Sequence, residues 1–431
     1  MEPLDALLER LWSTPAPPEV RRKARRIALD TLGCALAALE HPAVRSLAAR
    51  LGEMDDGRVA LGSLDARLAP SAACAVLAAA ACWDEACEGL ARAHGRPGVP
   101  VAAACMGLGL KLNVAMKDFI EALVAGYEVG ARMGERLRIR PGMHVDGCWP
   151  ALGAAAGASR LLGEPPATAR AAIEIAASQL PFSLYLPVEQ GADARNTYLA
   201  HAAWLGAFAA SAACSGVAAP SGAIERFAAL ALSNAGLPAY AGGDRYLILD
   251  AYLKGYAAVR HVHYGAEAAL RLRSRIRTVE AANLAIYPEA VQYCGNRAPR
   301  TPIQAQFSLS FGVAAALRFG RLDAAVYRAP EFEDAELRRL EGLVRVRAEE
   351  ALGQGGRREA VLRIGALEER VSVLKGDPAR PFTDGEVAAK FMHAASPSLG
   401  RAAAEGLAVR LLEADETAPL RAVLEPAMRY N

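Results

Sequence analysis

Two side chains suited to proton transfer, Asp84 and His94, stand ten residues apart just after a long apolar segment. That segment, residues 72–82, contains only Ala, Leu, Val and Cys, a composition typical of a buried helix. An isolated charge in an apolar interior is costly, so it is usually paired or used in chemistry. The pattern therefore indicates a site in which Asp84 orients His94. The alternative is that Asp84, Glu85 and Glu88 begin a solvent-exposed connection.

The histidines number only seven, so their positions in the sequence are informative. His144 lies in a Gly-containing loop before an Ala/Gly-rich helix, whose N-terminus would favour an anion. Lys254 comes a few residues before His261 and His263. Arg195 lies in a loop just before a helix, and its guanidinium would offer a carboxylate a two-pronged contact that Lys lacks. Imidazoles suit acid–base work and cations bind carboxylates, although a single loop His or Arg is more often structural.

Metal ligation is a competing use of these residues, because His261 and His263 could share one face of an extended segment and hold zinc with Asp84. The short-spaced His and carboxylate motifs of metal sites are missing from the sequence, however. The eight cysteines contain no Cys-x-x-Cys pair, and there is no Gly-x-Ser-x-Gly elbow. No Gly-x-Gly-x-x-Gly fingerprint follows a strand-like segment. We therefore expect chemistry without a metal or an organic cofactor.

Composition limits the class of protein. A chain of 431 residues is long enough for two domains, and 53% hydrophobic residues with only 6% aromatic ones favour closely packed helices. A net charge of +2 with both signs interspersed argues against nucleic-acid binding. No apolar run approaches the ~20 residues of a membrane span, and the acidic N-terminus is unlike a signal peptide. We expect a cytoplasmic protein that binds neither nucleic acid nor membrane.

Apolar residues at three- and four-residue spacing predict a succession of helices through the first part of the chain. The expected helices span roughly residues 18–38, 41–52, 70–82, 99–112, 116–138, 149–163, 167–180, 196–215 and 221–235, with stops at Gly and Pro such as residues 236–238. Later, alternating patterns predict strands within residues 273–287 and at 343–348, 359–364 and 369–373. Residues 353–358 are expected to form a hairpin turn between two of these strands. Further helices are expected at 301–319 and after Thr383.

These elements predict a mainly α fold with two domains. A large all-helical domain would be built from both chain ends, residues 1–255 and 392–431. A smaller α+β lid domain, residues 256–391, would be inserted between them.

Several ordered segments carry a recognisable pattern: Ala28–Ala37, Phe119–Val129 with its Gly-Tyr-Glu-Val ending, His144-Val-Asp-Gly147, Thr301–Ser308, and Leu374–Thr383 with its Lys-Gly-Asp-Pro string. They resemble, in this order, the N-terminal helix, a core helix, a pocket loop, a lid helix start and the stretch after the lid strands of the MmgE/PrpD family. This family includes 2-methylcitrate dehydratase, cis-aconitate decarboxylase and iminodisuccinate epimerase. The resemblance covers nearly the whole chain, and its last string is the most specific.

The resemblance implies a helical domain with an α+β lid, a homodimer, and an active site in the cleft between the domains without metal or organic cofactor. Asp84 and His94 match pocket residues of the family. His144 matches a second pocket His, and Lys254 matches the Lys that opens the lid hinge. Arg195 stands where Lys is common.

Three features depart from the family pattern. Val259 stands where decarboxylase and epimerase members carry a His, whereas His263 occupies a His position found in other members. The family's Asp-Asp and His-Pro pairs are Trp83-Asp84 and His94-Gly95 in this chain. The pocket Lys has become Arg195.

Residues and resemblance together predict a lyase, of dehydratase or decarboxylase type, that acts on a small di- or tricarboxylate by proton transfer next to a carboxylate. An epimerase of an amino or imino dicarboxylate is the alternative, and Val259 motivates a further one, a non-catalytic paralogue. The expected catalytic residues are Asp84, His94, His144, Lys254, His261 and His263, and the expected substrate-binding residues are Arg195, Glu88, Tyr256 and Arg260. Which His is the base and which the acid stays open at this level.

Overall fold

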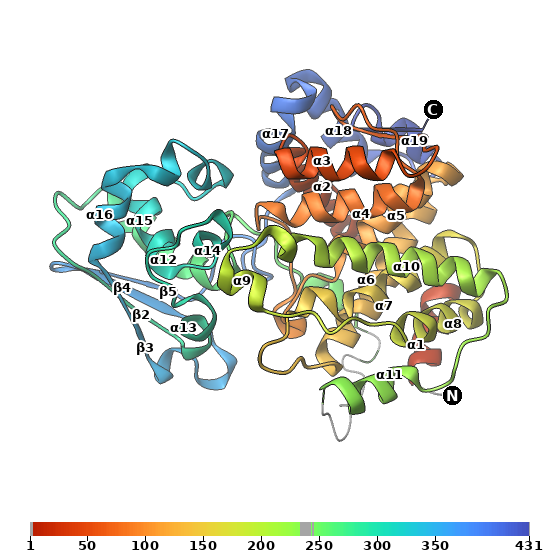
Figure 1. The fold of residues 1–431 in the computed structure, drawn as a ribbon, viewed down its shortest axis with the longest axis horizontal. Helices are drawn as coiled ribbons and strands as arrows, with labels where there is room; N and C mark the ends of the chain where they lie inside the picture. The colour runs from red at the N-terminus through yellow and green to blue at the C-terminus, as the bar shows by residue number, and fades with distance from the viewer. Residues whose placement is uncertain (1–2, 233–242, 244, 431) are drawn as a thin grey trace.

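The computed structural model describes residues 3–232, 243 and 245–430. A large helical domain and a smaller α+β lid domain lie side by side (Figure 1). Each has its own hydrophobic core. The described residues are mainly helical and their strands form two small sheets, so the predicted fold class is confirmed.

Helices rich in Ala and Gly build the helical domain, and many of them begin with proline, whose missing N–H costs nothing in the first turn. Their bounds are α1 Pro3–Ser13, α2 Pro18–Ala38, α3 Pro42–Gly52, α4 Pro70–Trp83, α5 Gly98–Leu112, α6 Met116–Arg136, α7 Pro150–Leu161, α8 Pro166–Ala177, α9 Leu186–Gln190, α10 Tyr198–Cys214 and α11 Ala223–Phe227. The predicted helices from 18–38 to 196–215 are therefore confirmed to within a few residues. The last predicted helix begins as α11 and a π turn, Ala228–Leu232. Its remainder, and the predicted stop at residues 236–238, lie outside the described residues.

Glycine lets the core helices approach closely. A Cβ atom on Gly126 of α6 would lie only 2.7 Å from the carbonyl oxygen of Gly153 in α7. Larger side chains there would push the two helices apart. This contact matters for the site, because the C-terminal end of α6 and the residue before α7 both border the cavity described below.

The lid domain combines a four-stranded sheet with five helices. Strands β2 Ala282–Ile286, β3 Val344–Ala348, β4 Ala360–Ile364 and β5 Leu367–Val371 lie in the order β3-β2-β4-β5, and β2 and β3 are parallel. The helices are α12 Arg260–Arg273, α13 Pro288–Cys294, α14 Pro302–Gln306, α15 Leu309–Phe319 and α16 Ala335–Leu343. Helices α12 and α15 pack against each other, and α12 also packs on β4 and β5.

Two local predictions in the lid were wrong. Residues 353–358 connect β3 to β4, but β2 lies between those two strands, so this turn closes no hairpin. The hairpin joins β4 to β5 instead, with Gly365 at a φ of 57°. The helix predicted at 301–319 is broken into α14 and α15, because the Ser308 side chain caps a new helix start by accepting from the N–H of Phe311.

The chain returns to the helical domain through α17 Asp384–Leu399, α18 Arg401–Glu413 and α19 Leu420–Leu424. Helix α17 packs on α2, where Phe391 contacts Gly33. The predicted domain boundary between residues 391 and 392 therefore falls inside α17, which is part of the helical core. Strand β1 Val59–Leu61 pairs with β6 Met428–Tyr430 near the C-terminus.

Within the described residues, no single helix combines the length and hydropathy of a membrane span. Helices α2 and α3, bent by 97° relative to each other, meet that criterion only as a pair. Most residues of α2 are buried in the helical core.

Candidate active site

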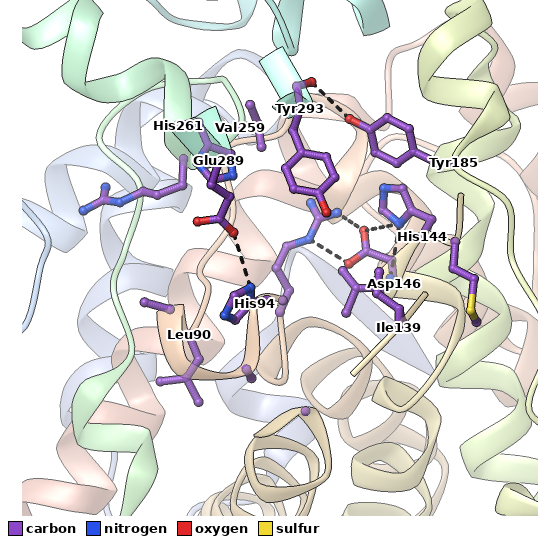
Figure 2. A pocket seen from close by; sticks show the side chains of 18 of the residues that line it. Leu90, His94, Ile139, His144, Asp146, Tyr185, Val259, His261, Glu289 and Tyr293 are labelled. Carbon is purple, nitrogen blue, oxygen red and sulfur yellow. Dashed lines mark hydrogen bonds and ion pairs between the residues drawn. The ribbon is translucent and has the colours of Figure 1, made fainter. Parts of the chain in front are cut away.

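A cavity of about 430 Å³ lies between the helical domain and the lid. The helical side comprises the segment after α4, the end of α6 and the loop that follows it. The lid side comprises the start of α12, helix α13 and Arg358 just before β4. Figure 2 shows His94 and His144 from the helical side and His261, Glu289 and Tyr293 from the lid around this space. The volume is in the range of small-molecule sites.

Glu85 is the centre of a buried ion cluster on the floor of the cavity. Its carboxylate accepts hydrogen bonds from Lys254 Nζ at 2.6 Å, from Arg96 at 2.9 Å and from Arg195. Burial disfavours the carboxylate, but these cations outweigh burial and hold the pKa of Glu85 well below its usual range. The backbone φ of Glu85 is 53°, a left-handed conformation that non-glycine residues rarely adopt and that is often found at functional sites.

Asp146 is the second anion of this cluster. It pairs with Arg96 and lies 3.7 Å from the Arg195 guanidinium. Burial opposes ionisation here too, yet the neighbouring cations lower the pKa of Asp146. Arg96, Arg195 and Lys254 thus face two carboxylates, so the floor carries one excess positive charge when Lys254 is protonated. A partly neutralised, buried group of cations is suited to an anionic ligand.

His144 is buried beside this cluster as a neutral imidazole. Burial, together with Arg195 and Arg96, lowers its pKa to about 4 in spite of the nearby Asp146 carboxylate. Its Nδ1 accepts a hydrogen bond from the backbone N–H of Asp146 at 3.2 Å. A neutral ring whose Nδ1 accepts carries its proton on Nε2. His144 therefore presents an N–H donor, and its ring stacks on Tyr185.

His94 differs in the atom closest to Nδ1, which is a carboxylate oxygen; at His144 the Asp146 carboxylate lies 3.8 Å from Nδ1, farther than the backbone nitrogen of Asp146. The Nδ1 atom of His94 lies 3.4 Å from a carboxylate oxygen of Glu289 in the lid, and Arg358 donates to the other oxygen at 3.1 Å. The hydrogen bond from His94, assisted by Arg358, lowers the pKa of Glu289 to about 2 although burial acts against it. When Nδ1 donates to Glu289, Nε2 of the neutral ring keeps its lone pair and can act as a base. Figure 2 shows this contact across the domain boundary.

A third imidazole, His261, comes from the first turn of α12. Its Nδ1 lies 2.6 Å from the hydroxyl of Tyr287, and its ring stacks on Tyr293. Burial, with the help of Arg358, lowers the pKa of His261 to about 3. His261 is therefore a neutral ring on the lid side of the cavity.

Asp84 lies outside this cavity, although the sequence predicted it as a partner of His94. It borders a second cavity of about 250 Å³ and pairs with Arg328 at 3.0 Å. The expectation that Asp84 orients His94 is thus wrong, because Glu289 of the lid makes that contact. The solvent-exposed alternative for this segment is also wrong, since its three carboxylate residues are all buried.

Three further predicted site residues make structural contacts away from the cavity. Glu88 accepts from the backbone N–H groups of Gly98 and Val99 at the start of α5, and burial raises its pKa to about 8. Tyr256 donates to Glu267 of α12. His263 contacts the carbonyl of Ala258 at 3.0 Å.

Arg195 and Arg260 line the cavity with guanidinium groups that already have protein partners. Arg195 is 1% exposed and donates to the carbonyl of Cys82, to Asn196 and to Glu85. Both terminal nitrogens are occupied and only the buried Nε has no hydrogen-bond partner among the described residues, which leaves the charge of Arg195, and not a two-pronged contact, to act on a ligand. Arg260 pairs with Asp377.

The cavity residues that the sequence does not predict as site residues include Glu85, Arg96, Asp146, Glu289 and Arg358. A local signal exists for the first three, because they stand within two residues of Asp84, His94 and His144. Glu289 and Arg358 have no such signal, since only the packing of the lid brings them to the cavity.

The zinc arrangement considered from the sequence does not form. His261 and His263 lie on a helix and contact different partners, and Asp84 borders the other cavity. In the part of the chain that the structure describes, no group of three or more His, Cys, Asp or Glu side chains is arranged to hold a metal ion.

Two protein family models match most of the helical domain and of the lid. The family model of the MmgE/PrpD N-terminal domain matches residues 7–233, and that of the MmgE/PrpD C-terminal domain matches residues 256–414. No curated protein matches the chain. Because the two matches cover most of both domains, the chain belongs to the MmgE/PrpD family, whose members are in general lyase-like enzymes.

Proposed function

We propose that this protein is a cofactor-independent lyase of the dehydratase type that acts on a small di- or tricarboxylate. The observation that carries the proposal is the pairing, in one cation-rich cavity, of a His poised as a base with a His poised as a hydrogen-bond donor. His94 has a carboxylate at Nδ1, whereas His144 accepts an N–H there. The two rings therefore present opposite functions from their Nε2 atoms.

The charges of the cavity support a substrate with two carboxylates. Its cationic lining residues are Arg96, Arg138, Arg195, Lys254, Arg260 and Arg358. The carboxylates that contact this set are Glu85, Asp146, Glu289 and Asp377. Six lining cations against these four paired carboxylates leave the cavity with excess positive charge when Lys254 is protonated, which suits a substrate with more than one carboxylate.

In the proposed reaction, His94 Nε2 removes a proton from the carbon next to a substrate carboxylate. The resulting enediolate is stabilised by the floor cations and by the His144 N–H, which are already in place when the charge develops. The ammonium of Lys254 then protonates the departing hydroxyl, so that water leaves and a carbon–carbon double bond forms. Burial lowers the pKa of Lys254 although Glu85 acts against this, which makes the ammonium a better acid.

An epimerase is the second candidate, and His261 favours it. Epimerisation needs groups on both faces of one carbon, and His261 is a neutral imidazole that lines the cavity from the lid. In that case one ring would remove the proton and another would return it to the opposite face.

The test is NMR in D₂O with a panel of 2-hydroxy and 2-amino di- and tricarboxylates. Loss of water supports the dehydratase, and loss of CO₂ would point to a decarboxylase. Deuterium uptake with inversion and no net loss would replace it with the epimerase. Lys254→Met serves as the disabled variant, and Lys375→Met, a lid lysine paired with Glu386, serves as its matched control. No change in any compound with either enzyme would reject catalysis of this type.

A further inference from the structure

The two sides of the cavity differ in chemistry above the charged floor. The lid presents mainly charged and polar side chains, such as Arg260, His261, Glu289 and Arg358. The helical domain also has an apolar lining. Ile139 and Val145 are its partly exposed residues, and Leu90, Leu137, Met143 and Trp149 are buried around them. Figure 2 shows two of these apolar residues, Leu90 and Ile139, among the polar residues of the site.

We call these apolar lining residues of the helical domain the apolar wall. Two glycines allow much of this wall to pack closely together. A Cβ atom on Gly134 would lie 2.5 Å from Ala93 Cβ and 2.8 Å from the Trp149 ring. One on Gly95 would lie 2.6 Å from Trp149 and 3.3 Å from Val145. The absence of side chains at both glycines therefore lets Trp149 pack against the segment that carries His94. The wall thus begins beside the proposed base.

Size and charge together limit what fills this space. A cavity of about 430 Å³ is in the range that accommodates drug-sized ligands, which is more than a four-carbon dicarboxylate needs. Such a compact dianion would contact the floor cations but leave the exposed parts of Ile139 and Val145 facing water. Covering that wall with hydrocarbon would gain the free energy of removing apolar surface from water.

We propose that the substrate is a dicarboxylate that carries an alkyl arm of several carbons, seated on the apolar wall of the helical domain. The inference rests on the proposed function for the two carboxylates and adds the arm to it. The carboxylates lie at the floor cations near Lys254, and the arm extends along Ile139 and Val145, which are only partly buried and so remain accessible.

The experiment measures the affinity of succinate, methylsuccinate, propylsuccinate and hexylsuccinate by calorimetry. These probes keep both carboxylates but have no hydroxyl to lose, so binding is read without turnover. Burial of one methylene is worth about 0.8 kcal/mol, so we expect about a fourfold lower Kd for each methylene that reaches the wall. Hexylsuccinate should therefore bind at least ~100-fold more tightly than succinate.

Variants locate the arm on the wall. Ile139→Gln should weaken hexylsuccinate at least about tenfold more than it weakens succinate, because it places an amide against the chain. Val145→Thr, which nearly preserves the side-chain shape, should weaken hexylsuccinate in the same selective way. It replaces Ile139→Gln in the test if that variant folds poorly. Val409→Gln is the matched control: Val409 is half exposed on α18, outside the cavity, and its replacement should change neither affinity.

An equal Kd across the series, with succinate itself bound, would overturn the arm and leave the proposed function intact. Tighter binding of the longer probes that Ile139→Gln and Val145→Thr do not reduce would also overturn it, because the arm would then lie elsewhere. If no succinate of any length binds, the inference falls together with the two-carboxylate substrate of the proposed function.

Discussion

The two cavities at the domain junction differ most in how their carboxylates are held, although these carboxylates are neighbours in sequence. Asp84 borders the smaller cavity and pairs with Arg328, whose side chain is 45% exposed. Glu85 borders the larger cavity and contacts Lys254 and two buried arginines. The backbone of Glu85 is left-handed at the point where the two neighbouring carboxylates turn to different cavities. Burial beside several cations, as at Glu85, is thus a better guide to the site than a match to the family pattern, as at Asp84.

Replacing the central carboxylate should have the largest effect. Glu85→Gln removes the carboxylate that three buried cations share. Removal of one partner from a buried ion pair typically costs about 3–5 kcal/mol. We expect a loss of that size in the free energy of unfolding, measured with urea. Glu368→Gln is the control, because its pair with Arg363 is about half exposed and worth at most about 1 kcal/mol. Equal stability of the two variants would contradict the cluster's central place.

The groups proposed to act on the substrate come next. His144→Ala and Lys254→Ala should each lower turnover by at least about 100-fold, the usual scale for acid–base and donor groups. The readout is kcat/KM on whichever carboxylate the NMR panel identifies, with folding checked by circular dichroism. A folded variant of either residue that keeps most of its activity would remove that residue from the mechanism.

The contact between domains should have a smaller effect. Glu289→Gln keeps the shape but removes the charge that holds His94, so we expect kcat to fall about tenfold, below the full loss of a base. Because Glu289 is not proposed to bind the carboxylates, KM should change much less. Glu369→Gln, at another ion pair of the lid, is the control. An unchanged kcat would mean that His94 needs no carboxylate partner.

The buried imidazoles should make stability depend on pH in a defined direction. Burial lowers the pKa of His144 to about 4 and that of His261 to about 3, whereas an unfolded His titrates near 6.5. Below pH 6.5 the unfolded chain therefore binds more protons, so the stability that the neutral rings contribute is complete above pH 6.5 and lost as pH falls toward 4.

Urea unfolding between about pH 6 and pH 5 measures this effect. His144→Gln should reduce the pH dependence of the unfolding free energy by about 1 kcal/mol per pH unit. His393→Gln, at an exposed position of α17, is the control and should leave it unchanged. The same dependence in wild type and His144→Gln would show that His144 is not buried as a neutral ring.

The smaller cavity should contribute least. Asp84 is buried, and burial raises its pKa, so its charged form contributes little net stability. Asp84→Asn removes that charge and leaves Arg328, its only ion-pair partner among the described residues, in contact with solvent. We expect a change of at most about 1 kcal/mol in the free energy of unfolding and turnover within about threefold of wild type. A loss of activity as large as that of Lys254→Ala would return Asp84 to the active site and undo the distinction between the two cavities.

The sequence predicted the helical fold well because its signals are local. Ala-rich runs bounded by Gly and Pro gave most helices to within a few residues. The prediction of a hairpin at residues 353–358 was wrong, because β2, from much earlier in the chain, lies between β3 and β4. A pattern along one segment carries no information about a partner that distant.

The site shows the same limit. His94, His144 and Lys254 stand in Gly-containing segments of the sequence, and all three line the cavity. The sequence does not reveal which cavity each of the carboxylates of Asp84 and Glu85, in the turn after α4, would border. It also could not supply Glu289, because a contact across two domains exists only once both have folded and packed.

Deuterium exchange at the substrate carbon tests the central claim most directly, because exchange needs the base but not the departure of the hydroxyl. The measurement compares wild type, His94→Gln and Asp84→Asn by NMR in D₂O with the carboxylate that the panel identifies. We predict that His94→Gln loses both exchange and elimination, whereas Asp84→Asn retains both. Exchange that survives in His94→Gln but disappears in Asp84→Asn would contradict the account, because the base would then lie on the side of the smaller cavity.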